Sequence, residues 1–358
     1  MSKIKNYVTV FIMAGFFMIL VLWNIFGKKA DYSETERRVL AKFPEVTAEH
    51  VLSGKFAKEF EEYAVDAFPM RDAWRRVKAY VRTGLFVQKD NNGIYTADGH
   101  IAKLEYPMNT EMLDHALGIF AKVYDKYLKD NKVYFTVVPD KNRYLAQKNG
   151  YPSLDYDEFT EYVKQGMDYA EYIEIVDLLS AEDYYSTDTH WRQEALPDVA
   201  ERIAEAMGTK LSGDYKTEKL DIPFNGVYVG QSALMCQPDT IFYLTNQVTR
   251  RVTVEGAKAV YDMDKAKGKD AYEMFLSGNQ PIITMRDAEN TSGKRLILFR
   301  DSFGSSIAPL LMSGYSEIVL VDLRYASSDM LGQYVDFEAA DVLFLYSTLM
   351  LNNSLGMK

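Results

Sequence analysis

A long apolar run near the N-terminus is the strongest pattern in the chain. The 19 residues from Val8 to Phe26 contain Asn24 as their only strongly polar member. As a helix this run would rise about 28 Å, close to the roughly 30 Å hydrocarbon core of a bilayer. No small-x-small cleavage site of a secretory signal peptide comes after it. We therefore expect an uncleaved signal anchor within residues 1–30. A cleaved signal peptide and a buried soluble helix are the alternatives.

The orientation of this span is inferred from the mass of chain on its C-terminal side. Lysines flank both ends of the run, so charge bias decides little. About 330 residues come after a single span, and export of such a mass is the usual reason for an N-terminal anchor. We expect a single-pass protein of the cell membrane, anchored by residues 8–26, whose catalytic domain is extracellular.

Residues 31–110 show helical periodicity that a proline interrupts. Apolar residues recur every three or four positions in 56–63 and again in 74–81. Because Pro69 lies between the two patterns, we predict two helices joined there. A turn at residues 90–93, followed by a short hairpin around residues 94–99, is predicted next. We expect this part of the chain to be a helical stem.

From residue 111 onward, short apolar runs alternate with helical segments. The pattern predicts strands at 133–138, 173–177, 295–299, 317–321 and 341–346, and helices at 112–128, 159–172, 192–207 and 304–312. Such alternation indicates a parallel sheet covered by helices on both faces. The segment 209–290 breaks the alternation with turns and β-like runs. We therefore predict an α/β catalytic domain over residues 111–358 with an insertion at about 209–290.

Composition and charge narrow the classes of function. The chain has 41 Lys and Arg against 51 Asp and Glu, a formal net charge of −10. A net acidic chain without a basic stripe is a poor candidate for nucleic-acid binding, so we expect no nucleic-acid partner. Cys236 is the only cysteine, and there are four histidines. This count excludes an internal disulfide framework and argues against a metal site, and we expect no cofactor.

One candidate for chemistry is Ser302, in the segment 300–304 that comes after a predicted strand and opens a predicted helix. Ligands of open α/β sheets bind beyond the carboxyl ends of the strands. A serine on a sharp strand-to-helix turn exposes its hydroxyl there, and backbone N–H groups at the helix start would face a developing oxyanion. The alternative is that this Asp-Ser pair only caps the helix.

A second candidate is the segment 186–191, which contains Asp188 and His190 after a predicted strand. A serine nucleophile needs a base, and the base needs an orienting acid. Residues two apart in an extended segment project to the same side, so Asp188 could orient His190. The alternative is a capped turn with a surface histidine. Together the two segments supply a Ser302–His190–Asp188 triad.

The remaining histidines and the tryptophan of this segment receive structural interpretations. His50, His100 and His115 lie in charged, turn-like or amphipathic contexts and are predicted to be surface residues. Trp191 is predicted to pack beside the loop rather than to form a platform for a sugar.

These residues resemble the DHHW family of Gram-positive bacteria, relatives of the alginate O-acetyltransferases AlgX and AlgJ with an SGNH-hydrolase-like fold. The resemblance covers about Ser33 to Tyr346. It rests on SETERRVLAKFP, on Asp-Thr-His-Trp and Asp-Ser-Phe-Gly, and on the segments Phe68-Pro-x-Arg71, Val138-Pro-Asp-Lys141 and Val321-Asp-x-Arg-Tyr325. In that family the Asp-x-His pair precedes the serine, as it does here. This chain has Thr189 where the family name has its first histidine, and the alginate relatives also have threonine there. The nearest match to an oxyanion asparagine is Gly278-Asn279.

The resemblance implies acetyl transfer to an exported or cell-surface polysaccharide. Ser302 would attack the acetyl donor, His190 would accept its proton, and Asp188 would orient His190. Because exported compartments lack acetyl-CoA, a membrane-bound O-acyltransferase is the implied acetyl supplier. A carbohydrate acetyl esterase with the same triad and a non-catalytic polysaccharide-binding or assembly protein are the alternatives. The acidic chain argues mildly against a strongly anionic polymer.

Overall fold

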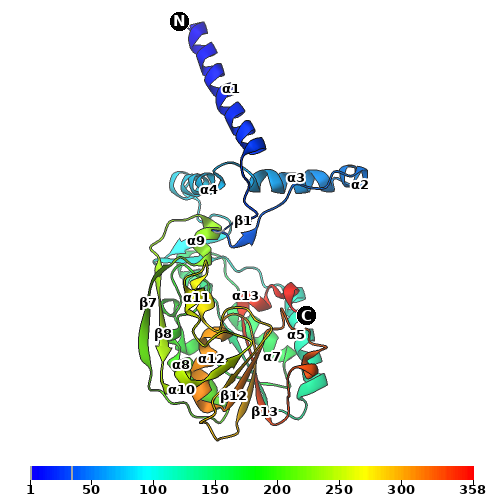
Figure 1. The fold of residues 1–358 in the computed structure, drawn as a ribbon, viewed down its shortest axis with the longest axis vertical. Coiled ribbons are helices and arrows are strands. Elements are labelled where there is room, and N and C mark those ends of the chain that lie inside the picture. The colour runs from blue at the N-terminus through cyan, green and yellow to red at the C-terminus, as the bar shows by residue number, and fades with distance from the viewer. Residues whose placement is uncertain (1, 34) are drawn as a thin grey trace. The chain divides into compact units, whose positions relative to one another are not determined.

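The computed structural model describes residues 2–33 and 35–358. The chain divides into two compact units, which are described separately (Figure 1). The stem unit consists of Met1–Asn92 and Val229–Met235. The body unit consists of Gly93–Tyr228 and Cys236–Lys358.

The helices of the described residues alternate with the strands along much of the body unit. The α-helices are α1 (Ser2–Phe26), α2 (Ala48–Leu52), α3 (Lys55–Asp66), α4 (Arg71–Tyr80), α5 (Thr110–Val123), α6 (Asn142–Leu145), α7 (Tyr156–Gly166), α8 (Pro197–Ala206), α9 (Val227–Ser232), α10 (Gln247–Arg251), α11 (Met263–Ala266), α12 (Gly304–Leu311) and α13 (Thr348–Leu351). The strands are β1 (Tyr32–Ser33), β2 (Arg38–Val39), β3 (Ile94–Ala97), β4 (His100–Lys103), β5 (Val133–Val138), β6 (Glu171–Tyr172), β7 (Lys216–Phe224), β8 (Asp239–Thr245), β9 (Thr253–Glu255), β10 (Ile282–Arg286), β11 (Arg295–Arg300), β12 (Glu317–Val321) and β13 (Ala340–Ser347).

A seven-stranded sheet in the order β6-β5-β13-β11-β12-β10-β9 forms the centre of the body unit. The strands from β6 to β12 in this order run parallel. β10 runs antiparallel to β12, and β9 antiparallel to β10. The predicted α/β class is confirmed, and the sheet is mostly rather than entirely parallel. Both antiparallel strands come from the end of the predicted insertion, whose β7 and β8 form a separate two-stranded sheet.

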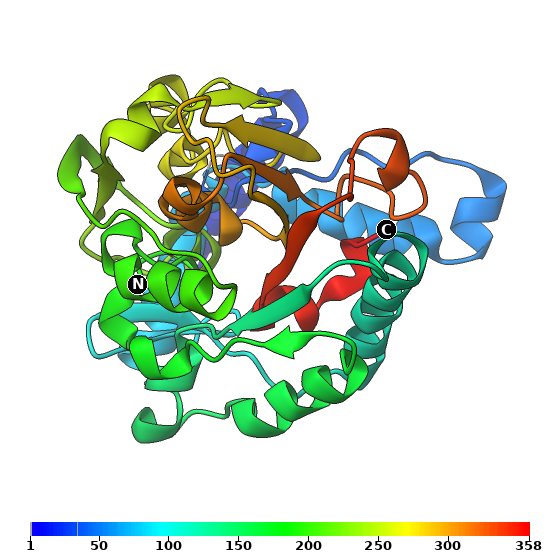
Figure 2. The ribbon, with the colours of Figure 1, turned by 90° about the horizontal axis from the view of Figure 1, so that it is seen from below.

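Alternate residues of the central strands enter two apolar cores, one on each face of the sheet. Leu296 and Leu298 of β11 pack in the core that also contains side chains of α8 and α12. Ile297 and Phe299 pack on the other face with side chains of α5 and α7. Figure 2 shows the twisted sheet between these helical layers. The near-continuous apolar composition of β11, β12 and β13 results from this burial on both faces.

Three predicted elements of the body differ from the structure. The expected helix at 159–172 is wrong in its last part, because α7 ends at Gly166 and residues 171–172 form β6. The expected strand at 173–177 is wrong, because the Glu174 carboxylate accepts hydrogen bonds from the N–H groups of Ile175 and Val176 and turns the chain away from the sheet. Glu171 and Tyr172 pair with β5, and Ile173 still donates its N–H to the Phe135 carbonyl at 2.8 Å, so the chain leaves the sheet after Ile173. The expected helix at 192–207 is shorter, because Pro197 occupies the first turn of α8 and separates it from a short 3-10 turn.

The stem unit contains the predicted long apolar helix and the two helices flanking Pro69. The segment Lys3–Phe26 of α1 has the length and composition to cross a membrane, and its most apolar stretch has no contact that buries it. This complete exposure is inconsistent with the core helix of a soluble domain. α3 ends at Asp66 and α4 begins at Arg71, so the predicted pair of helices is confirmed.

Candidate active site

Ser302 lies at the end of the central strand β11, two residues before α12 begins. The Asp301 carboxylate fixes this turn: one oxygen accepts from the Phe303 N–H (3.0 Å), and the other accepts from the N–H (2.8 Å) and hydroxyl (2.6 Å) of Ser347. A side chain at Gly304 would place its Cβ 2.5 Å from the Cβ of Arg300. The turn that presents Ser302 therefore requires glycine directly after Phe303.

The structure brings the three predicted site residues together. Oγ of Ser302 lies 2.8 Å from Nε2 of His190, and Nδ1 of His190 lies 2.6 Å from Oδ1 of Asp188. Asp188 is fully buried and His190 nearly so, whereas Ser302 is partly exposed. Both distances are hydrogen-bond distances, so a proton can pass from the serine hydroxyl to the imidazole while the carboxylate orients the ring.

The loop that carries Asp188 and His190 does not come directly after a strand, contrary to expectation. Instead, a bridge between Tyr184 and Trp191 closes it. The Asp239 carboxylate fixes the first residues of the loop. It accepts hydrogen bonds from the Ser186 N–H (2.8 Å), the Thr187 N–H (2.7 Å) and the Thr187 hydroxyl (2.5 Å). The position of the acid–base pair is thus set by hydrogen bonds to a carboxylate from the β8 region.

A second segment from the predicted insertion braces the same loop. The Val227 N–H donates to Oδ2 of Asp188 at 2.8 Å, so both carboxylate oxygens are engaged. The Gly226 N–H donates to the Thr187 hydroxyl, and a Cβ at Gly226 would lie 2.3 Å from the Thr187 carbonyl. Nothing in the local sequence marks Gly226 or Asp239 as site residues, because only the tertiary fold brings them to the loop.

Tyr272 is a further residue that the sequence did not single out. Its ring stacks on the His190 imidazole with a centroid distance of 3.8 Å and an interplanar angle of 9°. Its hydroxyl lies 2.9 Å from that of Ser306, on the helix that Ser302 precedes. Tyr272 therefore restrains the plane of the imidazole and ties it to α12.

A buried lysine lies behind the acid–base loop. Lys141 donates from Nζ to the carbonyl oxygens of Tyr185 and Ser186, at 2.8 and 3.1 Å. Burial lowers its pKa to about 7, while the charges of Asp188 and Asp239 act in the opposite direction. Its bonds hold the loop backbone from the side opposite to Asp239.

The helix-start amides are already engaged. The Phe303 N–H donates to Asp301 Oδ1, and the N–H groups of Gly304 and Ser305 donate to the carbonyls of Asp301 and Ser302. The expectation that amides at this helix start face an oxyanion is therefore wrong for these three groups. Asn279, the nearest sequence match to an oxyanion asparagine, is exposed and accepts from Arg324 at 3.2 Å.

Four remaining predictions, on Trp191 and three histidines, can be compared with the structure. Trp191 is fully buried, and its indole N–H donates to the Ser306 hydroxyl, so it is a packing residue as expected. His100 is buried, so the expectation of a surface position is wrong for it, whereas His50 and His115 are half-buried. Among residues 2–33 and 35–358, no group of three His, Cys, Asp or Glu residues is placed to hold a metal ion.

Comparison with protein-family models gives no match, and comparison with curated protein sequences gives none either. Solved structures do match. A DHHW family protein from Eubacterium siraeum is 21% identical, with a TM-score of 0.60 over 75% of this chain and 95% of that one. Bacillus cereus PatB1, solved with a sulfonyl adduct, is 17% identical, with a TM-score of 0.56 over 72% of this chain and 97% of that one. These likenesses confirm the expected relationship in fold to a DHHW family protein.

A weaker likeness involves the O-acetyltransferase domain of Pseudomonas putida AlgJ. It is 14% identical, with a TM-score of 0.46 over 73% of this chain and 92% of that one. At identities of 21% and below, structural similarity defines the fold, and the activity has to be argued from the site.

Proposed function

We propose that the chain is an extracytoplasmic O-acetyltransferase that modifies an exported or cell-surface polysaccharide. The observation that carries this proposal is the hydrogen-bonded series from Ser302 through His190 to Asp188, with distances of 2.8 and 2.6 Å. The resemblance of the surrounding motifs to the DHHW family supports acetyl as the transferred group. The apolar helix α1 supports a membrane anchor. The resemblance to the family implies a membrane-bound O-acyltransferase as the acetyl supplier.

The reaction proceeds in two displacements. Oγ of Ser302 attacks the acetyl carbonyl of the donor while Nε2 of His190 takes the hydroxyl proton, and the tetrahedral intermediate collapses as His190 returns the proton to the leaving group. The product of this half-reaction is acetyl-Ser302. In the second half His190 takes the proton of a sugar hydroxyl, whose oxygen attacks the acetyl carbon. The tetrahedral intermediate collapses as the bond between the acetyl carbon and Oγ of Ser302 breaks, and His190 returns the proton to that oxygen.

The test uses a chromogenic acetyl ester and the variant Ser302→Ala. We expect loss of turnover of about 10³-fold or more, because the variant lacks the nucleophile. Ser316→Ala is the matched control, since that hydroxyl lies just before β12, at the opposite end of the sheet. It should retain full turnover. Equal turnover in both variants would refute the role of Ser302.

Acetyl transfer and ester hydrolysis differ in the acceptor. Intact-mass measurement should detect acetyl-Ser302 in the wild type and not in Ser302→Ala. Adding neutral oligosaccharides should then yield O-acetylated sugars at the expense of free acetate. Release of acetate alone, across a panel of acceptors, would favour the carbohydrate esterase. Absence of any acyl-enzyme in an intact fold would favour the non-catalytic assembly protein.

A further inference from the structure

The stem unit exposes an unusual amount of apolar surface. The stem apolar face is defined by the exposed large apolar side chains of residues 43–87 other than Val65, which lines the pocket beside Arg38: Phe43, Val46, Val51, Leu52, Phe60, Phe68, Met70, Trp74, Val77, Tyr80, Leu85, Phe86 and Val87. Leu52 is 88% exposed and Tyr80 75%. Contiguous apolar surface on this scale marks a site of contact with a membrane or a partner.

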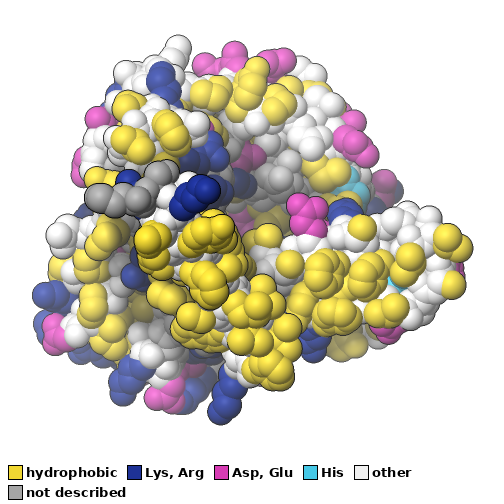
Figure 3. Space-filling view, turned by 90° about the horizontal axis from the view of Figure 1, so that it is seen from above, with side chains coloured by type: hydrophobic (Ala, Val, Ile, Leu, Met, Phe, Trp, Pro, Cys, Tyr) yellow, Lys and Arg dark blue, Asp and Glu magenta, His cyan; other side chains and the backbone are white. Residues whose placement is uncertain are grey.

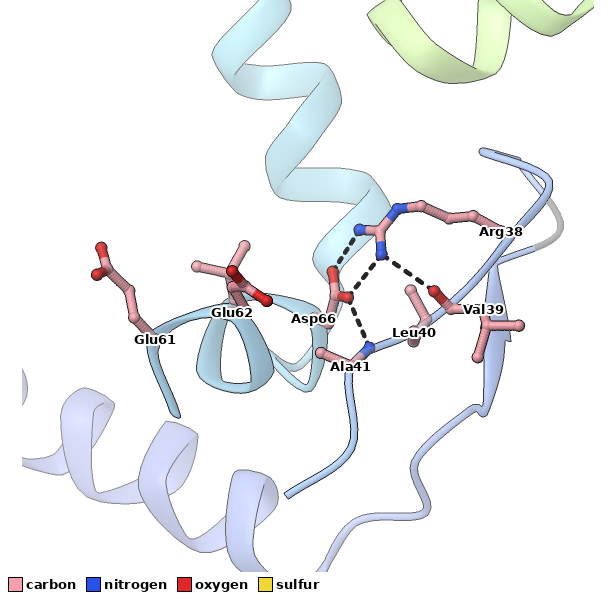
Figure 4. Close-up of a pocket in the computed structure, with 8 residues that line it drawn as sticks. Arg38, Val39, Leu40, Ala41, Glu61, Glu62 and Asp66 are labelled. Carbon is pink, nitrogen blue, oxygen red and sulfur yellow. Dashed lines mark hydrogen bonds and ion pairs between the residues drawn. The ribbon is translucent and has the colours of Figure 1, made fainter. Parts of the chain in front are cut away.

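Three charged side chains of α3 and α4, Asp66, Arg71 and Arg75, are bonded within the unit. The exposed surface of α3 also carries Lys58, Glu61 and Glu62 beside its apolar side chains. Arg38 binds both oxygens of Asp66 at 2.7 and 2.6 Å, and the Ala41 N–H adds a third bond at 2.9 Å (Figure 4). On α4, Arg71 and Arg75 both contact the Glu36 carboxylate. This network fixes the rotation of both helices, so the exposure of their apolar side chains is built into the unit.

The stem apolar face continues directly from the apolar helix α1. The Asn24 side-chain amide donates to the Ala67 carbonyl at 3.4 Å, and Lys29 binds the Tyr63 hydroxyl. Asn24 precedes the end of the apolar run at Phe26 by two residues, or about 3 Å along a helix. The C-terminal end of α3 is thereby held at the level where α1 leaves the hydrocarbon. Figure 3, viewed from the side on which α1 projects, shows hydrophobic side chains continuing from α1 along the α2–α3 arm.

The composition of the face suits the boundary between lipid and water. Phe43 makes edge-to-face contacts with Phe56, Phe60 and Tyr63, with centroid distances of 5.2 to 6.4 Å, and so forms an aromatic cluster. Aromatic rings of this kind gather at headgroup level. Residues 71–89 contain six Lys and Arg against one acidic residue; Arg71 and Arg75 bind Glu36, so at most four of the six can contact a bilayer. A helix with an apolar face and basic flanks binds in the plane of an anionic bilayer.

We propose that the stem apolar face lies in the headgroup and upper acyl layer of the bilayer that α1 spans. This rests on the anchoring role of α1 stated under the proposed function. The bilayer is the occupant that the observations favour, because the face adjoins the level at which α1 emerges. The stem would then be attached to the bilayer at two places: α1 spans it, and the stem apolar face lies in its surface layer.

Depth-dependent quenching on the full-length chain tests this proposal. In a Cys236→Ser background, single cysteines replace Phe60 or Val77 on the face, and Glu62 serves as the matched control on α3, where it lines the pocket beside Arg38. Phe16→Cys reports on the middle of α1. Each variant carries an environment-sensitive fluorophore and is reconstituted into nanodiscs of phosphatidylcholine and phosphatidylglycerol.

We expect lipids carrying a shallow quencher to quench the probes at 60 and 77, and aqueous iodide to quench the probe at 62. The probe at 16 should respond only to a deep lipid quencher. If 60 and 77 respond to iodide as strongly as 62 while 16 stays in lipid, the stem proposal fails and the anchor stands. If 16 also responds to iodide, the anchor itself fails. Shielding of 60 and 77 from both quenchers would mean that a second copy or another protein covers the face, which would overturn the proposal.

Discussion

The stem unit and the body unit of this chain treat apolar side chains in opposite ways. Among the described residues, 15 large apolar side chains are exposed in residues 27–92, and six in the much longer body unit. Their charges differ as well: residues 1–90 carry 15 Lys and Arg against 11 Asp and Glu, whereas residues 91–358 carry 26 against 40. The body has the surface of a protein surrounded by water. The stem has the apolar surface that the proposed contact with the bilayer requires.

This contrast separates two demands on the sequence. In the body, helices and strands bury their apolar faces against one another, and the site is built on the resulting scaffold. In the stem, ion pairs rather than an apolar core hold the helices together, as the Arg38–Asp66 contact illustrates. Ion pairs are screened by salt whereas an apolar core is not, so the stability of the stem should depend more on ionic strength than that of the body.

Truncating one leucine in each unit should expose this difference most strongly. Leu298 is fully buried at the centre of the sheet, and Leu298→Ala should lower the free energy of unfolding by about 2–5 kcal/mol. Leu52 is 88% exposed, and Leu52→Ala should change the free energy of unfolding in detergent by no more than about 0.5 kcal/mol. Urea unfolding followed by near-ultraviolet circular dichroism measures both. A comparable loss in Leu52→Ala would mean that the stem packs into a core after all.

Much of the body fold was predictable from its apolar runs. β5, β11, β12 and β13 were expected near their observed bounds, because a strand buried on both faces needs an unbroken apolar run. The strand expected at 173–177 failed because a single side chain, Glu174, competes for the backbone N–H groups. Local hydrogen bonds of this kind leave no mark on hydrophobic periodicity.

The candidate site was predictable only for the residues whose chemistry marks them in the sequence. Ser302, His190 and Asp188 were chosen for their chemistry and chain order, and the fold brings them to hydrogen-bond distance. Tyr272 and Gly226 act on the same loop and were missed. Their contribution is positional, and position depends on a tertiary fold that juxtaposes residues distant in the sequence. The catalytic role of the three predicted residues stays a prediction.

Replacing a glycine beside Ser302 tests how tightly the body builds its site. Gly304→Ala would force the new Cβ to within 2.5 Å of the Arg300 Cβ, so the turn has to shift. A displacement of about 1 Å at a nucleophile typically costs on the order of 100-fold in turnover. Gly118→Ala in α5 is the control, because nothing lies within 4 Å of its Cβ position. Turnover of an acetyl ester, read beside thermal melting, should fall in the first variant only. Unchanged turnover in Gly304→Ala would show that the turn is adaptable.

Two buried carboxylates, one in each unit, should respond to pH in opposite directions. Asp140 of the body accepts from Thr348 (2.7 Å) and Tyr156 (2.9 Å), yet burial outweighs these bonds and raises its pKa to about 6. Asp66 of the stem has a lowered pKa, chiefly because Arg38 donates to it. The native body therefore holds a proton on Asp140 that the unfolded chain releases near pH 4, and the stabilisation is lost as pH rises through 6. Asp66 stabilises the stem above its unfolded pKa and ceases to do so as the pH falls.

The variants Asp140→Asn and Asp66→Asn isolate these two contributions. Relative to Asp140→Asn, the wild-type body should lose at most about 3 kcal/mol between pH 4 and pH 7, the equivalent of two pKa units. Urea unfolding at a series of pH values measures this difference. In the stem, the α3 amides of the wild type should be better protected from hydrogen exchange than those of Asp66→Asn, after correction for intrinsic rates. This difference in protection should disappear as the pH drops below 4. If stability changed with pH in the same direction in both units, the contrast between them would be contradicted. The charge of each carboxylate would then be set by solvent, and not by burial in the body and by Arg38 in the stem.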